Sequence, residues 1–257
     1  MNKATINYAL HLGDNALILG HRNSEWCGHG PVLEQDIAIT NISLDLIGQA
    51  RNYYQYAASL INQTMPPSNA PANEDTLAYL RDAREFTNCL LVEQPNGDWA
   101  HTILRQFFFS AYQYFLYQQN NQLRPDEYPD EHLAAIAVKS LKEVTYHLRW
   151  SSEWVIRLGD GTDESHQRIA KAIEMLWPYT GEFFIAADYE NVMRIDLKNV
   201  KEKWMAKVEE IFSEATLTIP KQQWMHTGGK TGLHTEHLGY ILAELQFLQR
   251  SYPNSEW

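Results

Sequence analysis

The chain has 257 residues, a formal net charge of −11 at pH 7 and an aromatic content of 12%. It contains no run of basic residues, so we expect it to bind neither nucleic acid nor an anionic membrane surface. The absence of a secretory signal and of an apolar segment long enough to span a bilayer predicts a cytoplasmic protein without a membrane anchor.

Apolar and small residues recur at helical spacing along most of the sequence, and no segment shows the alternation that is typical of a strand. Turns rich in Gly, Pro, Asn or Asp separate the periodic segments. The sequence therefore predicts an all-α protein, with helices over Ala4 to about Arg22, about Val32 to Asn62, about Asp75 to Glu93, Trp99 to about Gln119, Leu133–Leu158, and about 164–187, 198–215 and 233–251.

The predicted helix over 32–62 is apolar around its whole circumference. Isoleucine and leucine occupy every side of its first half, at Ile37, Ile39, Ile42, Leu44, Leu46 and Ile47. A helix that is apolar on all sides is normally buried on all sides. We therefore expect this helix to lie at the centre of the protein.

The segment Leu133–Leu158 predicts a long core helix, because its apolar residues keep helical spacing for about seven turns. Asp130 precedes it as a candidate N-cap, and Gly159 follows it as a candidate C′ residue. The helix carries Glu143 and His147 one turn apart. Bundles that hold two iron ions use Glu-x-x-His on such helices, but three residues before His147 this chain has a valine.

Two pairs of predicted helices share a similar internal spacing, which is how ferritin-like four-helix bundles are laid out. The candidate positions are 31 to 34 residues apart in the first pair and 34 to 37 apart in the second. The sequence therefore predicts a ferritin-like helical bundle with a four-helix core and additional helices, in a single domain over residues 1–257. The positions that would face two iron ions are Asp14, Asp45, Gly48, Ser110, Val144 and His147.

This set of positions is poor in metal ligands. A working site needs roughly four carboxylates and two histidines. These positions supply two Asp and one His, with Gly, Ser and Val at the others. Such a set does not suit a multiply charged di-iron cluster, so we expect no catalytic residue, no metal and no other cofactor in this chain.

Asp14 and Asp45 nevertheless lie on apolar helix faces, where a lone carboxylate is too costly to bury. We expect the vacated metal site to hold a buried polar network, in which both aspartates accept hydrogen bonds and His147 donates with a lysine. The alternative for Glu143 and His147 is a pair on the helix surface. The predicted network is Asp14, Asp45, Lys139, Lys142, Glu143 and His147.

The segment Gly-Gly-Lys-Thr-Gly at 228–232 resembles part of a nucleotide-binding loop. A P-loop needs another glycine five residues before Gly229, where this chain has a tryptophan, and it needs a preceding strand. We therefore expect a flexible lead-in to the last helix instead. His234, Glu236 and His237 follow, but their spacing matches no standard zinc pattern and favours a capping or interface role.

Four long strings of the sequence carry a resemblance to a known family. They are NSEWCGHGP and its continuation at 23–51, REFTNCLLVEQPNGDWAHTILRQ at 84–106, KEVTYHLRWS at 142–151 and TGGKTGLHTEHLGYILAELQFLQR at 227–250. They resemble the C subunits of the multicomponent phenylacetyl-CoA epoxidases, the bacterial oxygenases that activate the aromatic ring in aerobic phenylacetate breakdown. The resemblance runs over essentially the whole chain.

The resemblance implies a function and a set of partners. In that family the di-iron centre and the CoA-thioester pocket belong to the A subunit, while a separate reductase supplies electrons. The C subunit is a ferritin-like paralogue with a structural role. The chain is thus expected to be a non-catalytic subunit that pairs with and stabilises the catalytic A subunit, and whose relation to the reductase is indirect.

Two other functions are left open by the residues alone. One is a metal-dependent oxygenase with a di-iron or mono-metal centre of its own, built from Asp14, Asp45, Glu143 and His147. The other is a ferritin-like iron store. Both need more ligands than the expected positions supply, so the ligand count favours the structural subunit.

Overall fold

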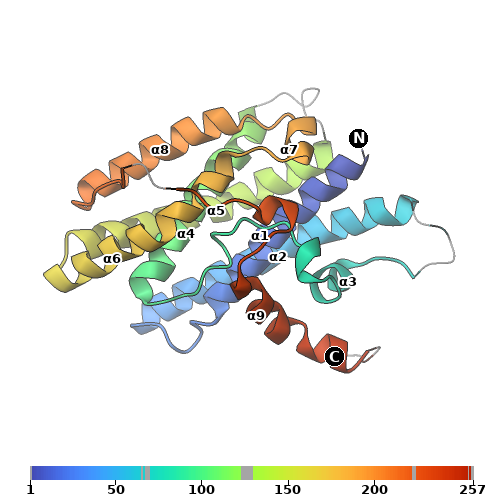
Figure 1. Ribbon diagram of the computed structural model, residues 1–257, viewed down its shortest axis with the longest axis horizontal. Coiled ribbons are helices and arrows are strands. Elements are labelled where there is room, and N and C mark those ends of the chain that lie inside the picture. Colours follow the sequence, from blue (N-terminus) through green and yellow to red (C-terminus); the bar gives the residue numbers. More distant parts are fainter. Residues whose placement is uncertain are drawn as a thin grey trace. The chain divides into compact units, whose positions relative to one another are not determined.

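A computed structural model describes residues 2–64, 66, 70–122, 130–221, 224–253 and 255 of the chain (Figure 1). This part of the chain is built from helices, and no residue in it forms a strand. The predicted all-α class is confirmed, and the helical architecture is consistent with a ferritin-like fold. None of the described helices combines the length and the apolar character needed to cross a membrane.

The helices fall into two compact units that are discontinuous in sequence. The first unit comprises Met1–Glu93, Ala187–Met193 and Gly228–Trp257, and the second comprises Gln94–Ala186 and Arg194–Thr227. The single domain expected over residues 1–257 stays a prediction. The first unit contains α1 (Asn2–Ser24), α2 (Leu33–Thr64), α3 (Glu74–Tyr79), η1 (Ala83–Glu85), α7 (Asp188–Val192), η5 (Gly229–Thr231), α9 (Glu236–Leu245) and α10 (Phe247–Ser251). The second contains α4 (Trp99–Gln122), α5 (Glu131–Gly159), α6 (Asp163–Leu176), η3 (Trp177–Tyr179), η4 (Gly181–Phe184) and α8 (Leu197–Glu214).

The first unit is built on a hairpin of α1 and α2, which lie side by side (Figure 1). Gly13 lies against Tyr54 and Gly20 lies against Leu46, so α2 runs back along α1 and the two helices are antiparallel. A methyl group on Gly13 would lie 2.7 Å from the ring of Tyr54. This close approach therefore requires glycine.

One side of α2 remains exposed. Ile39, Ile42 and Leu46 are fully buried, whereas Ile37 is 52% exposed and Leu44 is 61% exposed. The expectation that this helix is buried on every side is wrong for the chain by itself. The reason is geometric, because α1 packs along only one side of the helix.

The second unit is built on a hairpin of α4 and α5, on which α6 and α8 pack. Trp99 at the start of α4 presents its ring edge-on to Trp150 and Trp154 near the end of α5, so these helices are also antiparallel. The core of the unit is rich in aromatic side chains. Its buried Trp204 donates a hydrogen bond from Nε1 to the carbonyl oxygen of Phe108 at 2.9 Å, which satisfies the indole N–H.

The two ends of α5 were predicted with different success. Asp130 is the N-cap, as expected, and its side chain accepts hydrogen bonds from the N–H groups of His132 and Leu133. Gly159 is the last helical residue and not a C′ residue beyond the end, since Asp160 is the C-cap. Glycine is needed at 159 for packing, because a Cβ there would collide with the carbonyl oxygen of Ala215 at the end of α8.

Two predicted helices are shorter than expected. The helix expected over 75–93 is limited to α3 and the single turn η1, because Thr87 and Glu93 bond to Asp14 and His234 in other segments of the first unit. The helix expected over 164–187 ends at Leu176. Pro178 follows, and proline lacks the N–H that would continue the helix.

Replacing Gly159 by alanine is expected to lower the free energy of unfolding by about 1–3 kcal/mol, because the added methyl group overpacks the contact with Ala215. Urea denaturation followed by circular dichroism measures the change. Gly239→Ala in α9 is the matched control, since a Cβ there meets no atom within 4 Å and alanine favours a helix interior by roughly 0.5–1 kcal/mol. Equal midpoints for the two variants would contradict the packing argument.

Candidate functional site

Asp14 on α1 is the centre of a buried polar cluster in the first unit. Its side chain is fully buried, and Oδ1 accepts hydrogen bonds from the hydroxyl of Tyr54 at 2.7 Å and from Nη2 of Arg81. Oδ2 accepts from Nη1 of Arg81 at 3.2 Å, and from the backbone N–H and hydroxyl of Thr87 at 2.8 and 3.1 Å. These donors occupy the lone pairs of both carboxylate oxygens.

Arg81 provides the positive charge that Asp14 needs in the interior. Its Nε donates to the carbonyl oxygen of Leu77 at 2.5 Å, and its guanidinium carbon lies 4.2 Å from the ring centre of Phe86. Burial lowers the pKa of Arg81, but the charge of Asp14, the hydrogen bond to Asp14 and other neighbouring acidic groups together outweigh burial and raise the pKa above its usual value. Burial and the charge of Asp14 both raise the pKa of Tyr54, so its hydroxyl keeps the proton that it donates.

A second buried cluster joins α1, α7 and η5. Lys230 is 4% exposed, and its Nζ lies 2.9 Å from each carboxylate oxygen of Glu190. Nε2 of His11 lies 4.0 Å from Oε1 of Glu190. Burial nevertheless lowers the pKa of His11 despite the charge of Glu190, so the ring is neutral and forms no ion pair. Its Nδ1 donates to the carbonyl oxygen of Thr87 at 2.7 Å, which connects this cluster to the one around Asp14.

The segment 228–232 is therefore a turn that buries its lysine, and not the flexible lead-in that the sequence favours. Gly228 and Gly232 have φ angles of 132° and 82°, which L side chains rarely adopt. A Cβ at Gly232 would also collide with the carbonyl oxygen of Arg84. The glycines of this motif serve the backbone of the turn, and its lysine serves an internal ion pair.

A third cluster holds the start of α9. The buried carboxylate of Glu93 accepts from the N–H and hydroxyl of Thr235, both at 2.7 Å. It also accepts from Nδ1 of His234 at 2.8 Å and from Nδ2 of Asn88 at 3.0 Å. The other ring nitrogen of His234 lies 2.8 Å from the carbonyl oxygen of Phe86. Since both nitrogens face acceptors, the ring carries both protons.

The pKa of His234 is shifted in the direction that this geometry requires. Burial lowers the pKa, but the hydrogen bond and the charge of Glu93, together with the carbonyl oxygen of Phe86, outweigh it and raise the pKa of His234 above 6.5. The N-cap of α9 is Thr235, which makes no side-chain cap hydrogen bond, so the capping or interface role expected for His234, Glu236 and His237 stays a prediction. Glu236 is exposed and His237 is half-buried.

The positions expected to face iron are divided between the two units. The first unit contains Asp14, which is fully buried, Asp45, which is half-buried, and Gly48, which is exposed. Gly48 therefore does not line a buried site. The second unit contains Ser110 and two positions on α5, Val144 and His147, which are all fully buried.

The predicted polar network needs a correction at its donors. Lys139 and Lys142 are exposed, because α5 presents both positions on its outer side, and neither can act as a buried cation. Glu143 is half-buried. Whether Glu143 and His147 share a network with the aspartates of the first unit stays a prediction.

The residues at the expected positions do not fit a di-iron cluster. The lone pairs of Asp14 are occupied by protein donors, and Gly48 and Val144 offer no side-chain ligand atom. Within the described ranges, no three His, Cys, Asp or Glu side chains are grouped so that they could hold a metal ion.

Sequence reasoning missed the residues that form the three clusters of the first unit. They lie in turns or in one short helix, where no repeating pattern of apolar residues indicates which polar side chains are buried. These residues are Arg81, Thr87, Glu93, Glu190 and Lys230. One signal was available in LLVEQ at 90–94, where a single acidic residue follows three apolar ones. A charge in such a setting is normally paired.

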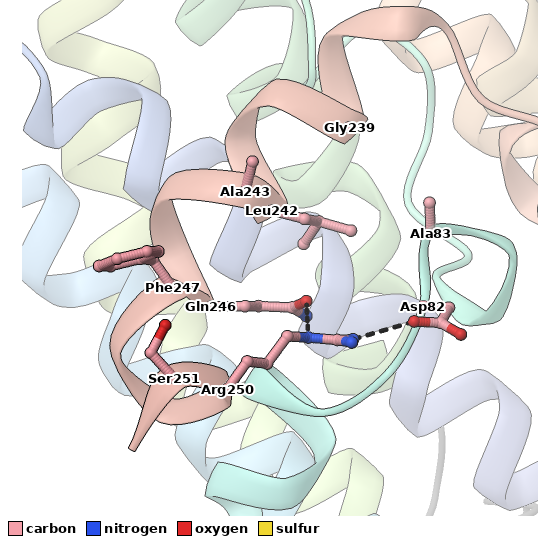
Figure 2. A pocket seen from close by; sticks show the side chains of 9 residues that line it. All are labelled: Asp82, Ala83, Gly239, Leu242, Ala243, Gln246, Phe247, Arg250 and Ser251. Carbon is pink, nitrogen blue, oxygen red and sulfur yellow. Dashed lines mark hydrogen bonds and ion pairs between the residues drawn. The ribbon is translucent and has the colours of Figure 1, made fainter. Parts of the chain in front are cut away.

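A surface pocket of about 350 Å³ lies where α9 and α10 pass residues 82–83 of the first unit (Figure 2). Arg250 crosses it, donating from Nε to the side chain of Gln246 at 2.9 Å and from Nη2 to Asp82 at 3.0 Å. Phe247 points away from this group. These hydrogen bonds hold α10 against the turn at residues 82–83.

Comparison with known proteins matches the whole chain. The phenylacetic acid catabolic protein family matches residues 1–257. The C subunit of the 1,2-phenylacetyl-CoA epoxidase of Escherichia coli (strain K12) is 48% identical over 262 residues, covering 100% of this chain and 100% of that protein.

Asp14→Ala is expected to lower the free energy of unfolding by roughly 3–5 kcal/mol, because it leaves the guanidinium of Arg81 buried without its counter-ion. Urea denaturation at neutral pH measures the loss. Arg81→Met combined with Asp14→Ala is expected to recover part of it, since neither charge then remains. The control is Glu164→Ala in the exposed pair with Arg168, which is expected to cost less than about 1 kcal/mol.

The stability that His234 contributes is expected to fall as pH rises. Its pKa is raised in the folded protein, so the contribution is complete below the ordinary value of 6.5 and is lost as pH rises through the folded pKa. Unfolding free energies of the wild type and His234→Gln, measured from about pH 6 to pH 9, should therefore converge towards alkaline pH. His132→Gln at an exposed position serves as the control. A constant difference between wild type and His234→Gln would refute the assignment.

Proposed function

The chain belongs to the phenylacetic acid catabolic protein family, and we propose that it is a non-catalytic structural subunit of a phenylacetyl-CoA epoxidase in aerobic phenylacetate breakdown. The observation that carries the proposal is the 48% identity to the C subunit of such an epoxidase over 100% of both chains. Similarity of this extent favours the same place in a multisubunit enzyme.

The environment of Asp14 supports a non-catalytic role. A metal ligand needs a lone pair that is directed at the ion, and Arg81, Tyr54 and Thr87 occupy the lone pairs of this carboxylate. The two positions without a ligand atom, Gly48 and Val144, weaken such a site further. We therefore assign the di-iron centre and the oxygen chemistry to a separate catalytic subunit, the A-type paralogue.

The proposed role is to pair with that catalytic subunit and stabilise it. Assemblies of this permanent kind commonly bury more than about 2,000 Å² in total. The reductase delivers electrons to the di-iron centre, so its relation to this chain is indirect. The chain itself needs no cofactor for this role.

Co-expression with the catalytic subunit tests the proposal. We expect a tag on this chain to retain the catalytic subunit through size-exclusion chromatography, with iron present in the complex and nearly absent from this chain purified alone. Epoxidation of phenylacetyl-CoA should require the catalytic subunit. If the two proteins never co-purify, the structural-subunit function is wrong.

The iron content of the isolated chain also tests the alternative function, a metal-dependent oxygenase that acts through a site of its own. One or two iron ions per chain in the isolated protein, lost in His147→Ala, would favour that alternative. His132→Ala on the same helix is the control, because His132 is exposed whereas His147 is fully buried.

A further inference from the structure

We propose that one side of α2 is the surface on which the catalytic subunit docks. This surface, the α2 face, consists of Leu33, Ile37, Leu44, Ile47 and Gly48, all of which are exposed. Leu33 alone is 72% exposed. The inference rests on the proposed function, because its occupant is the subunit that the function requires.

The α2 face is one continuous stripe of the helix. At about 100° per residue its positions fall within an arc of roughly 100°, and the stripe runs for about 22 Å along the axis. Thr40 and Asn41 complete the stripe, and both are uncharged. A partner helix would therefore meet apolar and small neutral side chains along some four turns.

One charged residue near each end of the stripe is engaged within the chain. At the N-terminal end Asp36 accepts hydrogen bonds from the N–H groups of Gly28 and Gly30, at 3.2 and 2.8 Å. At the C-terminal end Nε of Arg51 lies 3.3 Å from Oε1 of Glu74, which is at the start of α3. The first unit thus engages Asp36 and Arg51 and leaves the apolar residues of the α2 face uncovered.

Gly48 would allow a partner to approach α2 closely. A Cβ built there meets no atom within 4 Å, so packing within this chain does not require glycine. Its backbone also has no positive φ angle that would require glycine. Glycine is unfavourable in a helix interior, and a frequent reason to retain it is the close approach of another chain. Here Gly48 forms a notch beside Leu44 and Ile47.

The residue pattern of α2 predicts burial on all sides, which the chain alone does not provide. The helix is apolar around its circumference, which is the pattern of a helix buried on all sides. The hairpin with α1 buries Ile39, Ile42 and Leu46, and leaves Ile37 and Leu44 in water. A second protein on the α2 face resolves the discrepancy.

The size and charge of the α2 face favour a permanent partner. Four of its members are large apolar side chains that are 41–72% exposed, and a contiguous apolar patch of this kind is suited to the centre of an obligate interface. A transient electron donor would be expected to use charged groups for steering, and the stripe carries none. The permanent helical partner in the proposed function is the catalytic subunit.

The test is a binding titration of the full-length chain with the purified catalytic subunit. Leu44→Glu places a charge at the centre of the α2 face and is expected to weaken binding by about 30-fold or more. Gly48→Leu fills the notch and should weaken binding as well. Both positions are exposed, so circular dichroism should stay close to that of the wild type, and neither variant should lower the unfolding midpoint appreciably. Gly48→Leu is expected to raise the midpoint slightly, because glycine is unfavourable in a helix interior.

Leu248→Glu on α10 is the matched control, since this leucine is also exposed but lies outside the α2 face. Wild-type affinity for both Leu44→Glu and Gly48→Leu, with binding of the wild type intact, would overturn the docking surface and leave the proposed function standing. Absence of binding by the wild type would overturn both. If the wild-type chain is instead a dimer by sedimentation, and Leu44→Glu makes it a monomer, the occupant is a second copy and the assignment to the catalytic subunit is wrong.

Discussion

The complete burial of an ionised carboxylate is the constraint on which the first unit depends. Asp14 lies inside the α1–α2 hairpin, and an uncompensated charge there would cost several kcal/mol. The turn after α3 therefore has to deliver Arg81 to it. The same requirement recurs where Glu190 meets Lys230 and where Glu93 meets a histidine. Irregular segments of the chain are held in place because they carry these counter-ions.

The long helices could be predicted from the sequence because their signals are local. The period of apolar residues located α1, α2, α4 and α5, and the N-cap at Asp130 depends only on the next few residues. The partner of Asp14 could not be predicted in this way. Arg81 lies 67 residues away and outside any periodic segment. Analogy with a di-iron bundle instead favoured lysines of α5, whose side chains are exposed.

The error over α2 has a different physical origin. Apolar residues on every side predict burial on every side, but one side of α2 is exposed in this chain. The structure of the chain alone exposes Ile37 and Leu44, so the sequence of this helix is more consistent with an assembly than with a monomer. The expectation of a central helix failed because α1 covers only one side of α2.

The discontinuity of the first unit has a consequence for biosynthesis. Glu93 leaves the ribosome well before its partners His234 and Thr235, which follow 141 and 142 residues later. Lys230, the counter-ion of Glu190, is likewise synthesised after the acid that it pairs with. A nascent or prematurely terminated polypeptide that stops before residue 228 therefore lacks the cations for two of these three buried acids. Two of the three buried ion pairs of the first unit therefore form only after residues 230–234 have been synthesised.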